Sequence, residues 1–258
     1  PHIHFEYRDS KSVPLNPLTM AFELEDQIMP VARELAVIPL SQNALVNASP
    51  LTQTFPLFRD KSGVYHFPDT ISVFGEFGFA MNVVDKREGA NNVYQFHRAE
   101  LMVDGNLEFE LSYDRIPFNQ GKFAKTMIEY DLKRKNLGEF QKLYRLPEHK
   151  KISIHSSDKS GILGLAPGVH SVEIRIFDAH GNKTIIKGTV AATFPMTLEA
   201  SEIFRDDKVV TLALSPKRGG LAIRDAVVYS FTKYGFADKK VEIIHSERIK
   251  RDLHITLQ

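Results

Sequence analysis

The sequence contains no cysteine and no tryptophan among its 258 residues. The absence of cysteine excludes disulfide bonds and thiolate metal sites, and it leaves the cellular compartment open. No run of about 18 apolar residues occurs, so we expect no membrane-spanning segment. The sequence begins at Pro1 without a signal peptide, and we expect any targeting signal to lie upstream of it.

An excess of charge of either sign is also missing. The 33 lysine and arginine residues nearly balance the 32 acidic ones, which gives a formal net charge of +1. This balance argues against a nucleic-acid partner and against binding to lipid headgroups. A hydrophobic fraction of 43% is enough for ordinary buried cores, and the 18 Phe and 8 Tyr residues favour strands. The length predicts about two domains.

After Asp26 the sequence reads as almost entirely β. Asp104-Gly105 lies between two alternating apolar runs and predicts a tight hairpin, and the run DAHGN at residues 178–182 predicts another. Residues 41–62 are polar and are expected to form a long loop, and residues 123–135 fit either a short helix or an irregular excursion. The predicted strands cover residues 33–39, 70–74, 77–85, 94–103, 107–113, 143–146, 151–154, 168–177 and 183–193.

A second β pattern follows residue 194, with strands expected at residues 209–214, 227–233, 241–244 and 253–257. Closely spaced strands separated by turn residues are typical of a β-sandwich. We therefore predict a mostly-β protein of antiparallel, immunoglobulin-like sandwich domains. Residues 25–193 would form one sandwich with insertions, and residues 194–258 a second one that is small or truncated.

The segment that carries chemistry is the first strand, which reads PHIHFEYRD. Residues i and i+2 of a strand face the same side, so His2 and His4 present two imidazoles to one surface while Ile3 and Phe5 face the other. Neutral imidazole is a zinc ligand, and a second imidazole beside it can transfer protons near neutral pH. A pair of surface histidines without a role is the alternative interpretation of this pattern.

The run PHIHFEYRD, followed by PLNPL, resembles the end of the peptidase domain in the lysostaphin-type zinc metallopeptidases. The resemblance implies that His2 is catalytic, that His4 is a ligand of Zn²⁺, and that Asn16-Pro17 closes the domain. Residues 1–24 would then be the C-terminal end of a truncated peptidase domain. The long β region that follows resembles, more diffusely, the C-terminal extensions of some envelope members of this family.

The sequence departs from the family in one important respect. The family's other two zinc ligands are a histidine and an aspartate spaced HxxxD, and none of the ten histidines here has Asp four residues later. A catalytic zinc ion normally has three protein ligands. We therefore expect this chain alone to bind Zn²⁺ weakly or not at all and to be inactive, unless a missing N-terminal segment or another chain supplies the remaining ligands.

Three other patterns fit simpler explanations. A cupin site is disfavoured because Glu6 follows His4 too closely. The oxygen-rich stretches at residues 85–92 and 178–182 lack the alternating spacing of a calcium loop and are interpreted as hairpin turns. His149 and His155, among several lysines, are interpreted as part of a solvated loop.

Two functions follow as hypotheses. The first is the C-terminal portion of a periplasmic or cell-envelope zinc metalloendopeptidase, with peptidoglycan peptides as its substrate and with accessory sandwich domains. The second is a non-catalytic β-sandwich module for adhesion or scaffolding that carries a peptidase remnant. Because sandwich folds host many functions, the fold alone does not choose between them.

Overall fold

The computed structural model describes residues 5–20, 26–87, 92–147, 152–193, 198–216, 228–231, 237–250 and 252–257. The chain divides into two compact units, Pro1–Thr193 and Phe194–Gln258. Both consist mainly of antiparallel strands, so the mostly-β class is confirmed. The immunoglobulin-like assignment stays a prediction, as does the membership of residues 1–24 in a peptidase domain.

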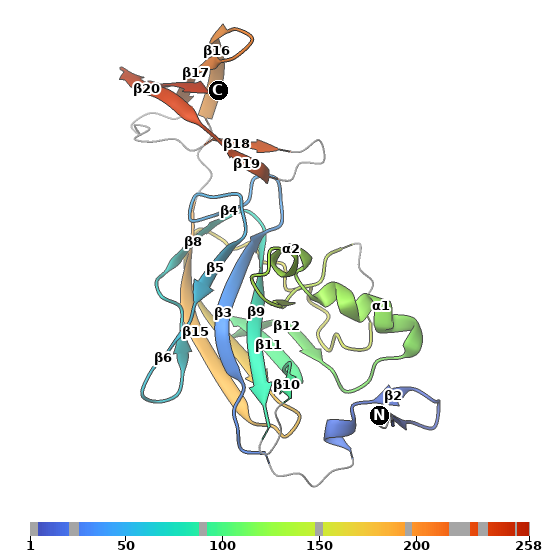
Figure 1. Cartoon of the computed structure of the whole chain (residues 1–258). Helices are drawn as coiled ribbons and strands as arrows, with labels where there is room; N and C mark the ends of the chain where they lie inside the picture. The colour runs from blue at the N-terminus through green and yellow to red at the C-terminus, as the bar shows by residue number, and fades with distance from the viewer. Residues whose placement is uncertain are drawn as a thin grey trace. The chain divides into compact units, whose positions relative to one another are not determined.

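The first unit contains two sheets that pack face to face (Figure 1). One sheet has the order β10-β9-β3-β5, with β13 on β9. The other has the order β12-β11-β14-β15, and β15 then pairs in parallel with both β7 and β8. The strands of the first sheet are β3 (Val31–Pro39), β5 (Gln53–Pro56), β9 (Phe77–Lys86), β10 (Val93–Tyr94) and β13 (Gln141–Lys142). Those of the second are β4 (Leu45–Val46), β6 (Phe58–Arg59), β7 (Tyr65–His66), β8 (Ile71–Phe74), β11 (Arg98–Val103), β12 (Asn106–Ser112), β14 (Gly168–Phe177) and β15 (Lys183–Ala192).

The strands that carry a plain alternation of apolar and polar residues face the core on one side only. In β14 the side chains of Val172, Ile174 and Ile176 are buried, and the residues between them are partly exposed. Asp104 and Gly105 have φ angles of 49° and 78°, as a two-residue hairpin turn requires. The turns at residues 104–105 and 178–182 therefore lie where the sequence predicts them.

Strand β9 is different because both of its faces are covered. Phe77, Phe79 and Met81 point into the main core between the sheets. Ala80, on the other face, belongs to a second core with Tyr144 and other apolar residues of the insertion after β12. A strand buried on both faces reads as a nearly continuous apolar run rather than an alternation, and residues 77–84 have this pattern apart from Asn82.

The insertion that covers this outer face is mainly helical and irregular (Figure 1). Its short helices are η2 (Phe118–Gln120), α1 (Gly121–Ala124), η3 (Lys125–Met127) and α2 (Tyr130–Arg134). The helical alternative for residues 123–135 is therefore confirmed. The strands predicted at residues 143–146 and 151–154 are wrong, because the described residues there form bends and turns that pack onto β9 and β12. The long loop predicted at residues 41–62 contains β4, β5 and β6.

The second unit has one sheet of order β16-β17-β21-β20 and a separate hairpin, β18-β19. Its small core consists of Leu253, Ile255 and Leu257 on one face of β21, with partly buried apolar residues around them. Its strands are β16 (Leu198–Arg205), β17 (Val210–Pro216), β18 (Val228–Phe231), β19 (Ala237–Val241), β20 (Ile243–Ile249) and β21 (Asp252–Leu257).

Candidate functional site

The two histidines of the zinc-peptidase motif, His2 and His4, lie outside the described residues. The described part of their strand begins at Phe5 and forms β1 (Tyr7–Arg8), which pairs with β2 (Pro14–Leu15). Phe5 and Tyr7 are exposed, and their rings meet edge to face at 5.9 Å. The catalytic role of His2 and the zinc-ligand role of His4 therefore stay predictions.

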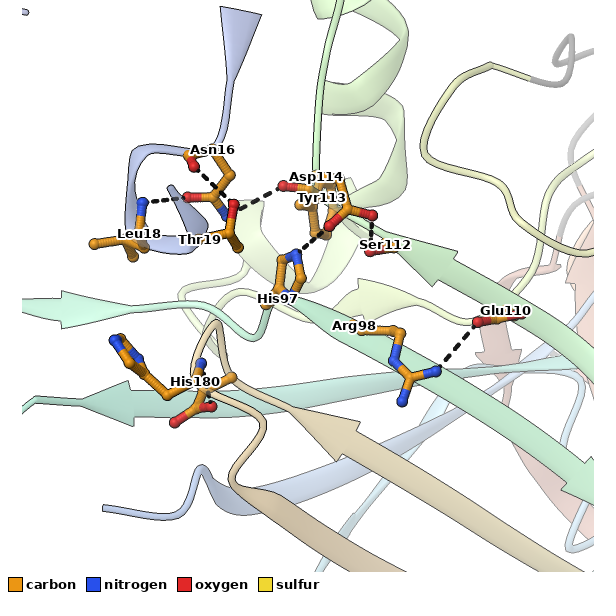
Figure 2. A network of polar contacts seen from close by, with 11 residues as sticks. Asn16, Leu18, Thr19, His97, Arg98, Glu110, Ser112, Tyr113, Asp114 and His180 are labelled. Atoms are coloured by element: carbon orange, nitrogen blue, oxygen red, sulfur yellow. Dashed lines mark hydrogen bonds and ion pairs between the residues drawn. The ribbon is translucent and has the colours of Figure 1, made fainter. Parts of the chain in front are cut away.

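The segment that follows the motif is attached to the sandwich. The main-chain N–H of Asn16 donates to the carbonyl oxygen of Asp114 at 2.7 Å, and its side-chain amide donates to the carbonyl of Tyr113 at 3.1 Å (Figure 2). The guanidinium of Arg8 lies over the ring of Phe118 at 5.2 Å. Residues 5–20 thus pack on the sandwich, as expected for a segment too short to bury a core of its own.

Asn16-Pro17 also has a local structural explanation. The side-chain oxygen of Asn16 accepts a hydrogen bond from the main-chain N–H of Leu18 at 3.0 Å and so caps the short helix η1 (Pro17–Thr19). Asparagine at the N-cap and proline at the first helical position are both favoured at helix starts. The pair matches the family pattern, and it is equally what this helix start requires.

A pocket of about 350 Å³ lies beside this attached segment. Its walls come from residues 16–18 of the segment, from the connection between β10 and β11, and from the helices of the insertion. Two polar residues of the first sheet line it as well. They are Asp85, at the end of β9, and Gln141, in the neighbouring strand β13.

Both of these side chains are almost fully buried, with 6% of Asp85 and 5% of Gln141 exposed. The Oδ1 atom of Asp85 and the Oε1 atom of Gln141 accept no hydrogen bond from any described residue. Burial, followed by the nearby carboxylates of Asp178 and Asp26, raises the pKa of Asp85 to about 7. A buried carboxyl group that titrates near neutral pH in a pocket is typical of a functional site.

Asp85 and Arg87 lie near the turn at residues 178–182, since Ala179 lines the same pocket as Asp85 and His180 contacts Arg87. Asp178 and His180, from the turn after β14, form a group with Asp26 whose ligand atoms lie within 4.8 Å of one another. The interpretation of residues 178–182 as a hairpin turn is confirmed, because Oδ1 of Asp178 accepts the main-chain N–H groups of His180 and Asn182 at 2.8 Å each. The ring of His180 is also engaged, since Arg87 donates to its Nε2 atom at 2.8 Å.

A serine, an aspartate and a histidine form a hydrogen-bonded group, and the histidine, His97, lines the pocket. Asp114 accepts a hydrogen bond from the hydroxyl of Ser112 at 2.5 Å and pairs with Nε2 of His97 at 2.8 Å (Figure 2). In a nucleophilic triad the histidine lies between the serine and the carboxylate, so that it can take the hydroxyl proton. Here the carboxylate lies between them, so the arrangement does not activate Ser112.

His155 does not belong to a solvated loop. It is 6% exposed, its Nδ1 atom accepts the main-chain N–H of Ile152 at 3.1 Å, and its Nε2 atom lies 3.4 Å from the sulfur of Met127. The interpretation from sequence is therefore wrong for His155, while His149 lies outside the described residues. A buried imidazole that accepts a main-chain N–H group has a structural role.

Sequence reasoning did not single out Asp85, Gln141 or Asp26 as individual site residues. One signal was available for Asp85. Residues 77, 79, 81 and 83 of β9 all face the core, and the same period of two places residue 85 on that face. An acidic residue in register with a buried apolar face needs a partner or a function.

No protein-family model, no curated protein and no solved structure matches the chain. Among the described residues, no helix has the length and apolar character needed to cross a membrane.

Proposed function

We propose that this chain is the C-terminal portion of a periplasmic or cell-envelope zinc metalloendopeptidase that cleaves peptidoglycan peptides, and that its sandwich is an accessory module. The residues PHIHFEYRD and Asn16-Pro17 support the peptidase assignment through their resemblance to the lysostaphin-type family. The observation that carries the accessory role is the attachment of residues 5–20 to residues 113–118. A segment held in this way would fix the end of a peptidase domain against the sandwich.

The zinc chemistry requires residues beyond this chain. Zinc, when bound, would polarise the scissile carbonyl and activate water. In this sequence His4 is the single ligand that the family pattern supplies, because the HxxxD spacing does not occur. The residues present therefore do not make up a complete zinc site, and we expect the isolated chain to bind Zn²⁺ weakly and to cleave nothing.

One observation favours the non-catalytic alternative, an adhesion or scaffold module. The walls of the pocket that contains Asp85 and Gln141 come, among the described residues, from the sandwich and from Asn16 and Leu18. A sandwich with its own pocket can act as a binding module without a working peptidase.

The experiment that tests the peptidase proposal uses the full-length protein, including whatever precedes Pro1. His4→Ala should remove bound zinc, because it deletes a ligand, whereas His2→Ala should spare zinc and abolish the cleavage of muropeptides. His245→Ala, at an exposed position of the second unit, is the matched control and should change neither property. Full zinc content together with full activity in His4→Ala would show that the HxH strand is a surface pair of histidines.

A further inference from the structure

The pocket at the end of the sandwich contains two buried hydrogen-bond acceptors that the described protein leaves unused. These are Oδ1 of Asp85 and Oε1 of Gln141, and both residues line the pocket. Leaving one buried acceptor unpaired costs about 1–3 kcal/mol. Two such atoms beside one cavity indicate that a group with several hydrogen-bond donors completes the site.

The charged side chains around the pocket indicate the sign of the charge on the group that binds there. Asp26 and Asp178 both act on Asp85, which brings three carboxyl groups to this end of the sandwich. The guanidinium of Arg87 opposes them, and it is also engaged with His180. Lys125 lines the pocket from an exposed position on the insertion. Among the described residues, three carboxyl groups therefore oppose two cationic side chains, and this balance favours a cationic ligand at pH values above about 7, where Asp85 is ionised.

A metal ion fits this site less well than an organic cation. In the group of Asp26, Asp178 and His180, the Oδ2 atom of Asp178 accepts the side-chain amide of Asn182 at 2.6 Å. The Nε2 atom of His180 accepts from Arg87, so its Nδ1 atom carries the ring proton and has no lone pair for a metal. A Ca²⁺ ion needs six to eight oxygen ligands, whereas two buried side-chain oxygens of the described residues in the pocket lack a hydrogen-bond donor.

The size and lining of the pocket suit an alkyl chain that ends in an ammonium group. A volume of about 350 Å³ is roughly ten times that of one water molecule. The rings of Tyr94, Phe96 and Tyr113 line it, and such rings favour both methylene groups and a nearby cation. Figure 2 shows Tyr113 with three of its neighbours in the wall, Asn16, Leu18 and His97.

We propose that this pocket binds the side chain of a lysine in a peptide, with Asp85 accepting from its primary alkylammonium group and Gln141 accepting another N–H group of the peptide. An ammonium group has three donors and no acceptor, which suits a carboxylate whose Oδ1 atom receives no hydrogen bond from the described residues. The proposal does not depend on zinc or on peptidase activity, since none of its residues belongs to the HxH motif.

The test measures binding of Nα-acetyl-lysine-methylamide to the 258-residue chain by calorimetry and NMR at about pH 8, where Asp85 is ionised. The same compound acetylated on its side-chain nitrogen is the matched ligand control, because it keeps the chain length and loses the charge. We expect the lysine compound to bind and to shift resonances of the pocket residues, and we expect the acetylated compound to bind at least tenfold more weakly. Equal binding of the two compounds, or binding of neither, overturns the proposal.

Variants then assign the binding to the two acceptors. Asp85→Asn and Gln141→Leu should each weaken binding by tenfold or more, while Asp69→Asn, at an exposed position, should leave it unchanged. Gln141→Glu keeps the shape of the side chain, adds a carboxylate and should tighten binding. This variant tests the role of residue 141 even if Gln141→Leu fails to fold. If Ca²⁺ stabilises the chain and the lysine compound does not bind, the pocket is a metal site and the proposal is overturned. Binding that emerges only in Lys125→Ala would show that the pocket is filled by the chain's own lysine, and it would also overturn the proposal.

Discussion

The side-chain amide of Asn16 donates a hydrogen bond to the main-chain carbonyl of Tyr113 at 3.1 Å, and in this way a residue near the start of the chain is fixed to the end of β12. The same side chain caps η1 through its oxygen atom, which accepts from the N–H of Leu18. One residue thus caps η1 and also contributes to the attachment of residues 5–20 to the sandwich.

Asn16→Ala should therefore loosen residues 5–20 without unfolding the sandwich. The loss of a cap and of a second hydrogen bond costs about 1–2 kcal/mol, so exchange of the Leu18 amide proton should accelerate by roughly tenfold. Asn16→Asp keeps the capping oxygen and removes the donor to Tyr113, so it should have an intermediate effect. Asn119→Ala, at an exposed position nearby, is the control. Unchanged exchange in Asn16→Ala would mean that other contacts hold the segment.

Gly78→Ala should destabilise the first unit. A Cβ atom at this position would lie 2.4 Å from Cδ1 of the Tyr144 ring, closer than atoms can approach. Overpacking of this kind costs about 1–3 kcal/mol, which urea unfolding would measure. Gly164→Ala is the matched control, because its nearest neighbour atom would lie at 3.9 Å. The double variant with Tyr144→Leu should recover part of the loss. If it recovers none, the Tyr144 contact is not the cause.

The prediction from sequence succeeds where one face of a strand is buried. β14 (Gly168–Phe177) has the predicted bounds, because its alternation of apolar and polar residues corresponds to one core face and one exposed face. The same reasoning places β11 and β12 around the Asp104-Gly105 turn.

The prediction of strands from sequence fails where apolar residues are buried outside a strand. The main-chain N–H of Leu143 bonds to Phe79 of β9, and Leu143 enters the main core while its neighbour Tyr144 enters the second one. The segment at residues 143–146 is therefore apolar without being a strand.

β16 was not predicted because the side chains of residues 198–205 are exposed, so no buried face marks that strand in the sequence. The pocket was not predictable, because Asp85 and Gln141 line one pocket only through the pairing of β9 with β13 and the covering insertion.

Asp104→Asn should lower the pKa of His170 and leave the hairpin intact. The Oδ2 atom of Asp104 lies 2.7 Å from Nδ1 of His170, and this hydrogen bond, followed by the one to the carbonyl of Ala166, raises the pKa of His170. The variant keeps the turn, because Asn-Gly is also favoured in two-residue hairpins. An NMR titration of His170 should show the pKa moving toward about 6.5.

The sign of the related stability change follows from the raised pKa. Protonated His170 stabilises the fold at pH values below its unfolded pKa, and this contribution is lost as the pH rises through the folded pKa. The variant should therefore lose stability relative to the parent at acidic pH and match it more closely at alkaline pH. A pKa of His170 that does not change in Asp104→Asn would contradict the assignment.

Asp85→Asn should stabilise the chain above neutral pH in the absence of ligand. The folded pKa of Asp85, about 7, is higher than its ordinary value of 3.8, so between these pH values the folded chain holds a proton that the unfolded chain releases. The free energy of unfolding contributed by Asp85 therefore falls as the pH rises from about 4 to about 7, and the penalty is complete above that range. Asparagine has the same shape and does not ionise, so the advantage of the variant should grow from near zero at about pH 4 to roughly 2–4 kcal/mol at about pH 8. Urea unfolding of both proteins across this range measures the difference, and Asp69→Asn, an exposed change of the same charge, should show no such trend. An advantage that is independent of pH, or that shrinks as the pH rises, would mean that Asp85 is already ionised and paired in the folded chain.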